Sequence, residues 1–163
     1  MTGRLYLVVC AAPPAAAIGE LIDLLPAWDS HVLATPNATA WLDAAALAAQ
    51  TGHPVRHEPR QPGDQEKLPR ADAIAVVPAT FNTINKWAAG INDTFALGVL
   101  NESIGLRLPV IVAPYVKPVL AAHPAFGESL ARLARWGVRV LPNEAIRTGS
   151  TRFDWSPVVA ALS

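Results

Sequence analysis

Cysteine is nearly absent from this sequence, which has a single one, Cys10, among 163 residues. One cysteine cannot form an internal disulfide or a metal site built from several cysteines. Cys10 ends an apolar run that is typical of a buried strand. We therefore expect an inert core thiol rather than a nucleophile.

An excess of one charge and a long hydrophobic run are also missing. Lys and Arg total 13, Asp and Glu total 13, and the formal net charge is +0. Because no cluster of basic residues stands out, we expect no nucleic-acid partner. Hydrophobic residues form 52% of the chain, yet no apolar run reaches the roughly 20 residues that span a bilayer. We expect no membrane span, and we assign the surplus apolar side chains to contacts between subunits.

The start of the chain has the charged and then apolar character of a signal peptide. The segment 11–17 is rich in alanine and proline, however, and is more typical of a turn that leads from a strand into a helix. We therefore expect a cytoplasmic protein.

Apolar strand-like runs alternate with helical stretches along the chain. The runs are 5–10, 31–34, 73–77, 110–113 and 138–141, and the helical stretches are 15–25, 36–50, 94–104, 124–136 and a short one from 156. A polar connection at 53–69 holds a possible short strand at 54–57. This alternation predicts one α/β domain over 1–163, a Rossmann-like or flavodoxin-like three-layer sandwich with a central parallel sheet.

Polar residues follow the apolar run 73–77 at once. Thr80, Asn82 and Thr83 stand where a helix begins, and they have no evident packing purpose. The first N–H groups of a helix lack intrahelical partners and favour a phosphate or carboxylate. Ligands of open parallel sheets bind outside the carboxyl ends of the strands, so we expect a ligand site here, with a second helix start at Thr35 and Pro36 beside it.

The sequence of segment 78–93 resembles the signature motif of a known family, the homo-oligomeric flavin-containing cysteine decarboxylases. That signature reads P-A-[ST]-x-N-T-[IM]-x-K-x-A-x-G-x-x-[DN]. It is matched by Pro78, Ala79, Thr80, Asn82, Thr83, Ile84, Lys86, Ala88, Gly90 and Asp93. The resemblance extends from about Leu5 to Pro142. It implies non-covalently bound flavin mononucleotide (FMN) and a homo-oligomer, a trimer or a dodecamer, in which a neighbouring subunit completes each flavin site.

The resemblance also implies which residues contact the cofactor. A second family motif, T-P-x-A-x-x-[FW], is kept at 35–41, which makes Thr35 the best remaining phosphate ligand. The first loop departs from the family's G-S-I-A-A-Y-K, because residues 11–17 lack the serine hydroxyl and a proline pair removes two amide donors. The full set of expected cofactor contacts is Ala12, Thr35, Thr39, Ala79, Thr80, Thr83 and Pro114.

Family decarboxylases pass a hydride from the cysteine side chain to the flavin, and the resulting thioaldehyde lets the carboxylate leave as carbon dioxide. By resemblance, Asn82 contacts the substrate carboxylate. Asp64 stands where the family has a histidine base, and Lys117 stands where it has a substrate-binding asparagine. The implied substrate is a small-molecule or peptide thiol, either phosphopantothenoylcysteine-like or a peptidyl cysteine.

Other interpretations of these residues stay open. Asp64 lies in a Pro-Gly-Asp turn, which by itself explains an aspartate, and Lys117 is equally well a solvated surface lysine. His57 and His123 are either displaced catalytic histidines or plain surface residues. With His31 and His53 scattered elsewhere, the histidine spacing indicates no metal site. Tryptophans 41 and 87 either border the flavin ring or pack in the core and between subunits.

Two other functions also remain open. One is an FMN-binding protein of the same family without decarboxylase activity. The other is a protein that binds a different phosphorylated ligand, such as a nucleotide, which the altered first loop allows.

Overall fold

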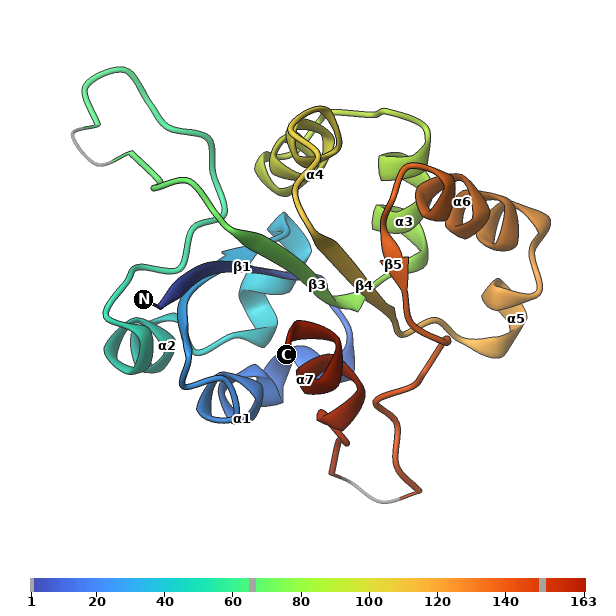
Figure 1. Ribbon diagram of the computed structural model, residues 1–163, viewed down its shortest axis with the longest axis horizontal. Coiled ribbons are helices and arrows are strands. Elements are labelled where there is room, and N and C mark those ends of the chain that lie inside the picture. The colour runs from blue at the N-terminus through green and yellow to red at the C-terminus, as the bar shows by residue number, and fades with distance from the viewer. Residues whose placement is uncertain (1, 65–66, 150–151) are drawn as a thin grey trace.

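A five-stranded parallel sheet forms the centre of the molecule in the computed structural model, which describes residues 2–64, 67–149 and 152–163 (Figure 1). The strands lie in the order β2-β1-β3-β4-β5, and each neighbouring pair is parallel. Their bounds are β1 Gly3–Val9, β2 Trp28–Ala34, β3 Ala73–Ala79, β4 Val110–Pro114 and β5 Arg139–Val140. The predicted parallel sheet is confirmed.

Helices cover both faces of the sheet, which confirms the three-layer prediction (Figure 1). On one face lie α1 (Ile18–Asp23), α2 (Ala44–Thr51) and α7 (Ser156–Leu162). On the other lie α3 (Phe81–Ala88), α4 (Phe95–Gly105) and α6 (Pro124–Arg135), with the short α5 (Pro118–Ala121) before α6. Within the described residues, every helix is too short or too polar to cross a membrane.

Side chains of alternate strand residues enter two separate cores. Tyr6 and Val8 of β1 pack with Trp87 of α3, whereas Leu5 and Leu7 pack on the opposite face with helices α1, α2 and α7. A strand that is buried on both faces reads as a continuous apolar run, and β3 is buried at every position.

Two predicted helices are broken in the structure. The expected helix 36–50 is a 3₁₀ helix, η2 (Pro36–Trp41), followed by an extended residue and then α2. The break comes from Asp43, whose carboxylate accepts a hydrogen bond from the Ala46 amide at 3.0 Å and so starts a new helix. The expected helix 15–25 likewise begins as a 3₁₀ helix, η1 (Pro13–Ala17), before α1. The expected strand at 54–57 is a single bridge between Arg56 and Leu33.

The strand order reverses between β1 and β3, and this reversal determines where a ligand crevice can form. The chain goes from β1 to β2 on one side and then crosses to β3 on the other side of β1. The connections that leave the carboxyl ends of β1 and β3 therefore diverge and leave a crevice between them. The amide of Cys10 still donates to the Pro78 carbonyl at 3.1 Å, so the two strand ends stay in register at its floor.

Candidate functional site

Two pockets meet at the carboxyl end of β3 and share Ala11, Thr80 and Asn82 as a common wall. One, the polar pocket, has a volume of about 350 Å³ and is also lined by Thr35, Pro36, Asn37, Thr83, Lys86, Thr94 and Leu97. The other, the apolar pocket, has a volume of about 600 Å³. Both volumes lie within the range of small-molecule sites.

Hydrogen-bond donors dominate the polar pocket. Threonine hydroxyls, asparagine amides and the Lys86 ammonium line it. Lys86 forms an ion pair of 2.7 Å with Asp93. A dianionic group in this pocket would be met by hydroxyl and amide donors and by a lysine whose charge is already partly compensated.

The corner between β3 and α3, residues 80–83, is held by its own side chains. Thr80 is the N-cap residue of α3, and its hydroxyl accepts a hydrogen bond from the Thr83 amide at 3.4 Å. Thr83 is buried. These two threonines therefore have a structural role in addition to lining the pocket, which differs from the expectation that they have no packing purpose. Asn82 is exposed and lines both pockets.

Cys10 lies directly behind this corner and is fully buried. Burial raises the pKa of its thiol, and hydrogen bonds with Thr83 and Thr80 offset this only in part. A protonated, buried thiol is a poor nucleophile, as the sequence predicts.

The apolar pocket draws its walls from segments far apart in the sequence. Its further lining residues are Ala12, Pro13, Trp41, Phe81, Tyr115, Val116, Lys117, Pro118, Leu120, Glu144 and Arg147. The Arg147 guanidinium lies 5.7 Å from the centre of the Tyr115 ring and 3.4 Å from Glu144. Reasoning from the sequence missed Glu144 and Arg147, because they follow β5 in a segment without a motif.

The side-chain amide of Asn143, here called the Asn143 clip, joins the loop after β4 to the loop after β5. The Asn143 side chain accepts a hydrogen bond from the Val116 amide at 3.0 Å and donates one to the Val116 carbonyl at 2.9 Å. The loop after β4, with Lys117, and the loop after β5, with Glu144, are thereby fastened to each other.

The other expected cofactor contacts are placed unevenly. Ala12 and Thr35 line the pockets. Ala79 and Pro114 are buried and paired with each other at the ends of β3 and β4, behind the pocket surface. Thr39 is outside the sets of residues that line the two pockets, and its hydroxyl donates to the Pro36 carbonyl at 2.8 Å.

Of the expected catalytic residues, the structure brings two together. Asn82 and Lys117 line the same apolar pocket. Asp64 lies elsewhere in the subunit, where its carboxylate accepts a hydrogen bond from the Gln61 amide at 2.7 Å and its carbonyl accepts from Arg60. This is the local bonding of a turn aspartate.

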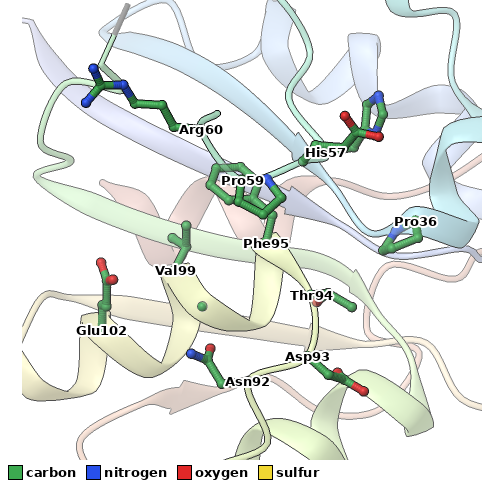
Figure 2. A pocket seen from close by; sticks show the side chains of 12 residues that line it. Pro36, His57, Pro59, Arg60, Asn92, Asp93, Thr94, Phe95, Val99 and Glu102 are labelled. Atoms are coloured by element: carbon green, nitrogen blue, oxygen red, sulfur yellow. The ribbon is translucent and has the colours of Figure 1, made fainter. Parts of the chain in front are cut away.

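The two histidines that we considered as displaced catalytic groups differ in place. His123 caps α6, since its Nδ1 atom accepts a hydrogen bond from the Ala125 amide at 3.0 Å. His57 lines a third pocket of about 570 Å³ beside α4, together with Pro59 and with Phe95 of α4 (Figure 2). Pro36 and Thr94 border both this pocket and the polar one. The His123 ring lies against that of Phe81 in the apolar pocket, with centroids 5.7 Å apart, so each histidine lies beside one part of the site.

The two tryptophans also separate. Trp41 is 44% exposed and lines the apolar pocket, whereas Trp87 is fully buried in the core. Only Trp41 can touch a ligand in these pockets.

A parallel sheet with helices on both faces and a crevice at the switch in strand order is a Rossmann-like α/β fold. The sequence matches the Flavoprotein family over residues 3–161, and the chain belongs to that family. The family resemblance seen in segment 78–93 is thereby confirmed.

Known relatives agree with this assignment. The chain is 30% identical over 146 residues to the coenzyme A biosynthesis bifunctional protein CoaBC of Thermococcus kodakarensis, covering 82% of this chain and 36% of that protein. Among solved structures, it resembles a PPC decarboxylase mutant complexed with pantothenoylaminoethenethiol, with a TM-score of 0.79, 19% identity and coverage of 99% and 97%. It also resembles the FMN-dependent cysteine decarboxylase SpaF, with a TM-score of 0.76, 23% identity and coverage of 98% and 95%.

The chain thus spans only 27 to 36% of the length of the CoaBC proteins it matches, whereas it covers nearly the whole of the two solved chains.

The residues of the two pockets fit a flavin mononucleotide. Such a ligand needs donors for a phosphate, polar groups along a ribityl chain and an apolar slot for a flat ring. The polar pocket has the donors, the apolar pocket has Trp41, Phe81 and Val116, and the shared wall joins them. The first loop offers few donors, because Pro13 and Pro14 carry no N–H.

Proposed function

We propose that this chain binds FMN non-covalently across the two pockets. The observation that carries the proposal is the shared wall of Ala11, Thr80 and Asn82 between a donor-rich pocket and an apolar one. Thr35, Thr80 and Thr83 would hold the phosphate and ribityl end. Ala12, Trp41 and Phe81 would border the ring.

Flavin affinity tests this proposal, with riboflavin as the matched ligand. Quenching of flavin fluorescence should show that FMN binds more tightly than riboflavin, by at least about tenfold, because riboflavin lacks the charged group that the polar pocket would receive. Equal affinity would contradict a phosphate in that pocket. If neither flavin binds, mass spectrometry of a copurifying small molecule would test the alternative of another phosphorylated ligand.

The reaction we propose is oxidative decarboxylation of a cysteine-type thiol acid. Bound FMN would supply a hydride acceptor for the carbon that carries the sulfur. The Asn82 amide would donate to the substrate carboxylate, and Lys117 lies on the same pocket to bind an anionic part of the substrate. The thiol proton leaves to a base, and the bond to the carboxylate then breaks to release carbon dioxide.

Release of carbon dioxide divides this reaction from flavin binding alone. Phosphopantothenoylcysteine and a peptide with a C-terminal cysteine are the substrates to test, each beside its serine counterpart, which lacks the thiol. Carbon dioxide from the thiol compounds only, with bleaching of the flavin spectrum, is the expected result. Tight FMN binding without release would favour a flavoprotein that is not a decarboxylase.

A homo-oligomer, either a trimer or a dodecamer, is part of the proposal. Val119 and Leu120 on α5 are 77% and 39% exposed beside the apolar pocket, which suits a subunit contact. Asp64 lies apart from Asn82 within one chain, so it would act as the base only at a neighbouring subunit's pocket. Light scattering after gel filtration should give the mass of three or twelve chains, and a monomer would exclude that role for Asp64.

A further inference from the structure

A carboxylate and two imidazoles meet at the edge strand β2, away from the pockets. Asp29 and His31 lie two residues apart on β2 and so face the same side of the sheet. His53 follows Gly52, whose φ of 77° ends α2 and returns the chain toward this strand. The expectation that the histidines are scattered is wrong for this pair, because the His31 and His53 rings are stacked with centroids 3.8 Å apart.

The donor atoms of these side chains converge. His53 Nε2 lies 2.6 Å from Asp29 Oδ1, and His31 Nε2 lies 3.4 Å from Asp29 Oδ2. One donor atom from each of the three residues lies within 4.8 Å of the others. A tetrahedral zinc ion about 2.0–2.2 Å from each donor would set the donors roughly 3.4 Å apart. The 2.6 Å contact between His53 and Asp29 would therefore lengthen, and the more exposed His53 ring would turn out of its stack on His31.

His31 is held ready to act as a ligand. Its ring is buried between His53 and the edge of the Tyr6 ring, whose centroid is 6.1 Å away. The side chains of Asp29 and His53 are 35% and 32% exposed, so an ion and its water molecules can reach the cluster.

Arg4 is the group that opposes a cation here. Its Nε atom lies 3.5 Å from Asp29 Oδ2, and its guanidinium also donates to the Arg70 carbonyl at 3.0 Å. Arg4 therefore competes for the carboxylate, while the bond to Arg70 gives the guanidinium a second anchor. Removing this charge should strengthen a true cation site.

We propose that Asp29, His31 and His53 bind a late first-row divalent cation such as Zn²⁺, with water in the remaining positions. Imidazole and carboxylate ligands suit this class of ion. The ion would fasten the segment after α2 to the edge strand. Asp29 lies six residues before Thr35 along β2, or roughly 20 Å from the polar pocket, so the site is separate from the proposed flavin site.

Titration of the whole chain with Zn²⁺ against a chromophoric chelator tests the proposal. We expect one ion per chain with a Kd of about 10 µM or tighter. The Co²⁺ form should show visible bands without a thiolate charge-transfer band, because Cys10 is not among the ligands. Absence of binding at this level, or a thiolate band, would overturn the assignment.

Variants separate this cluster from the other histidines. His53→Ala and Asp29→Asn should each weaken Zn²⁺ binding by more than about tenfold, whereas His57→Ala and His123→Ala should leave it unchanged. Equal losses in both pairs would overturn the proposal. Arg4→Gln should raise the affinity, a gain that misfolding cannot produce, and a lowered affinity in a folded Arg4→Gln protein would contradict Asp29 as a ligand.

Discussion

The two sides of the candidate site, the corner at residues 80–83 (the polar wall) and the first loop at residues 11–17 (the apolar wall), differ in their side-chain chemistry. The corner at residues 80–83 presents hydroxyl and amide groups on the first turn of α3. The facing first loop, residues 11–17, presents alanine and two prolines and forms a 3₁₀ helix without a side-chain cap. The corner therefore offers side-chain hydrogen bonds to a ligand, whereas the first loop offers backbone groups, such as those of Ala11, and mainly shape.

The proline-rich first loop gains a rigid backbone but loses hydrogen-bond donors. Proline fixes the backbone of the first loop without needing side-chain bonds, and Ala15 packs in the core below it. The loop is thereby rigid but has few donors. We expect ligand orientation to depend mainly on Thr80, Asn82 and Thr83.

The largest effect should come from placing a negative charge on the polar wall. Asn82→Asp changes one exposed atom group, so the fold should persist. The carboxylate would repel a bound phosphate and the substrate carboxylate, lowering FMN affinity and turnover by about a hundredfold or more. Flavin titration and carbon dioxide release measure this. Unchanged turnover would exclude Asn82 from contact with the substrate.

A smaller effect should follow from removing the capping hydroxyl. Thr80→Val should lower the free energy of unfolding by about 1 kcal/mol and FMN affinity by about tenfold. Asp43→Ala is the matched control, because Asp43 caps α2 outside the pockets. It should cost similar stability in urea unfolding without changing FMN affinity. If both variants weaken FMN equally, loss of stability rather than of a ligand contact explains the effect.

Adding a donor to the apolar wall should act in the opposite direction. Ala12→Ser places a hydroxyl at the rim of the apolar pocket, where the family pattern has serine. We expect the affinities for FMN and for riboflavin both to rise by about threefold, because Ala12 borders the proposed place of the ring, which both flavins carry. Fluorescence titration with both flavins measures the two gains. A loss of affinity would mean that Ala12, which is 6% exposed, has no room for the added atom.

The smallest effect should be the reaction of Cys10, which lies between the two walls, with a thiol reagent in the native protein. Its burial and raised pKa predict that a disulfide reagent at pH 8 labels the native protein at least about a hundredfold more slowly than the protein unfolded in urea. Absorbance of the released thiolate follows the reaction. Fast labelling of the native protein would show that the floor of the site opens readily.

The sheet could be predicted from the sequence because β3 and its neighbours are buried on both faces, which leaves uninterrupted apolar runs. The start of β2 was missed, since Asp29 and Ser30 belong to an edge strand and read as polar. The break before α2 was missed because the surrounding alanines favour a continuous helix, while one aspartate starts a new one.

The polar wall could be predicted because its residues are contiguous and follow a strand. Glu144 and Arg147 could not, since they reach the pocket only through the path of the chain after β5. His31 and His53 are separated by α2, and only the left-handed turn at Gly52 brings the second ring onto the first. Such proximity depends on tertiary structure and produces no periodic pattern in the sequence.

The Asn143 clip has a consequence for how this site can change. The Asn143 carboxamide ties the backbone after β4 to the segment after β5, and the Glu144 amide adds a hydrogen bond to the Pro114 carbonyl at 2.9 Å, so we expect Lys117 and Glu144 to shift together. A deletion or insertion on either side would displace both charges at once. Selectivity at this rim is thus more easily altered by exchanging side chains than by remodelling the length of either connection.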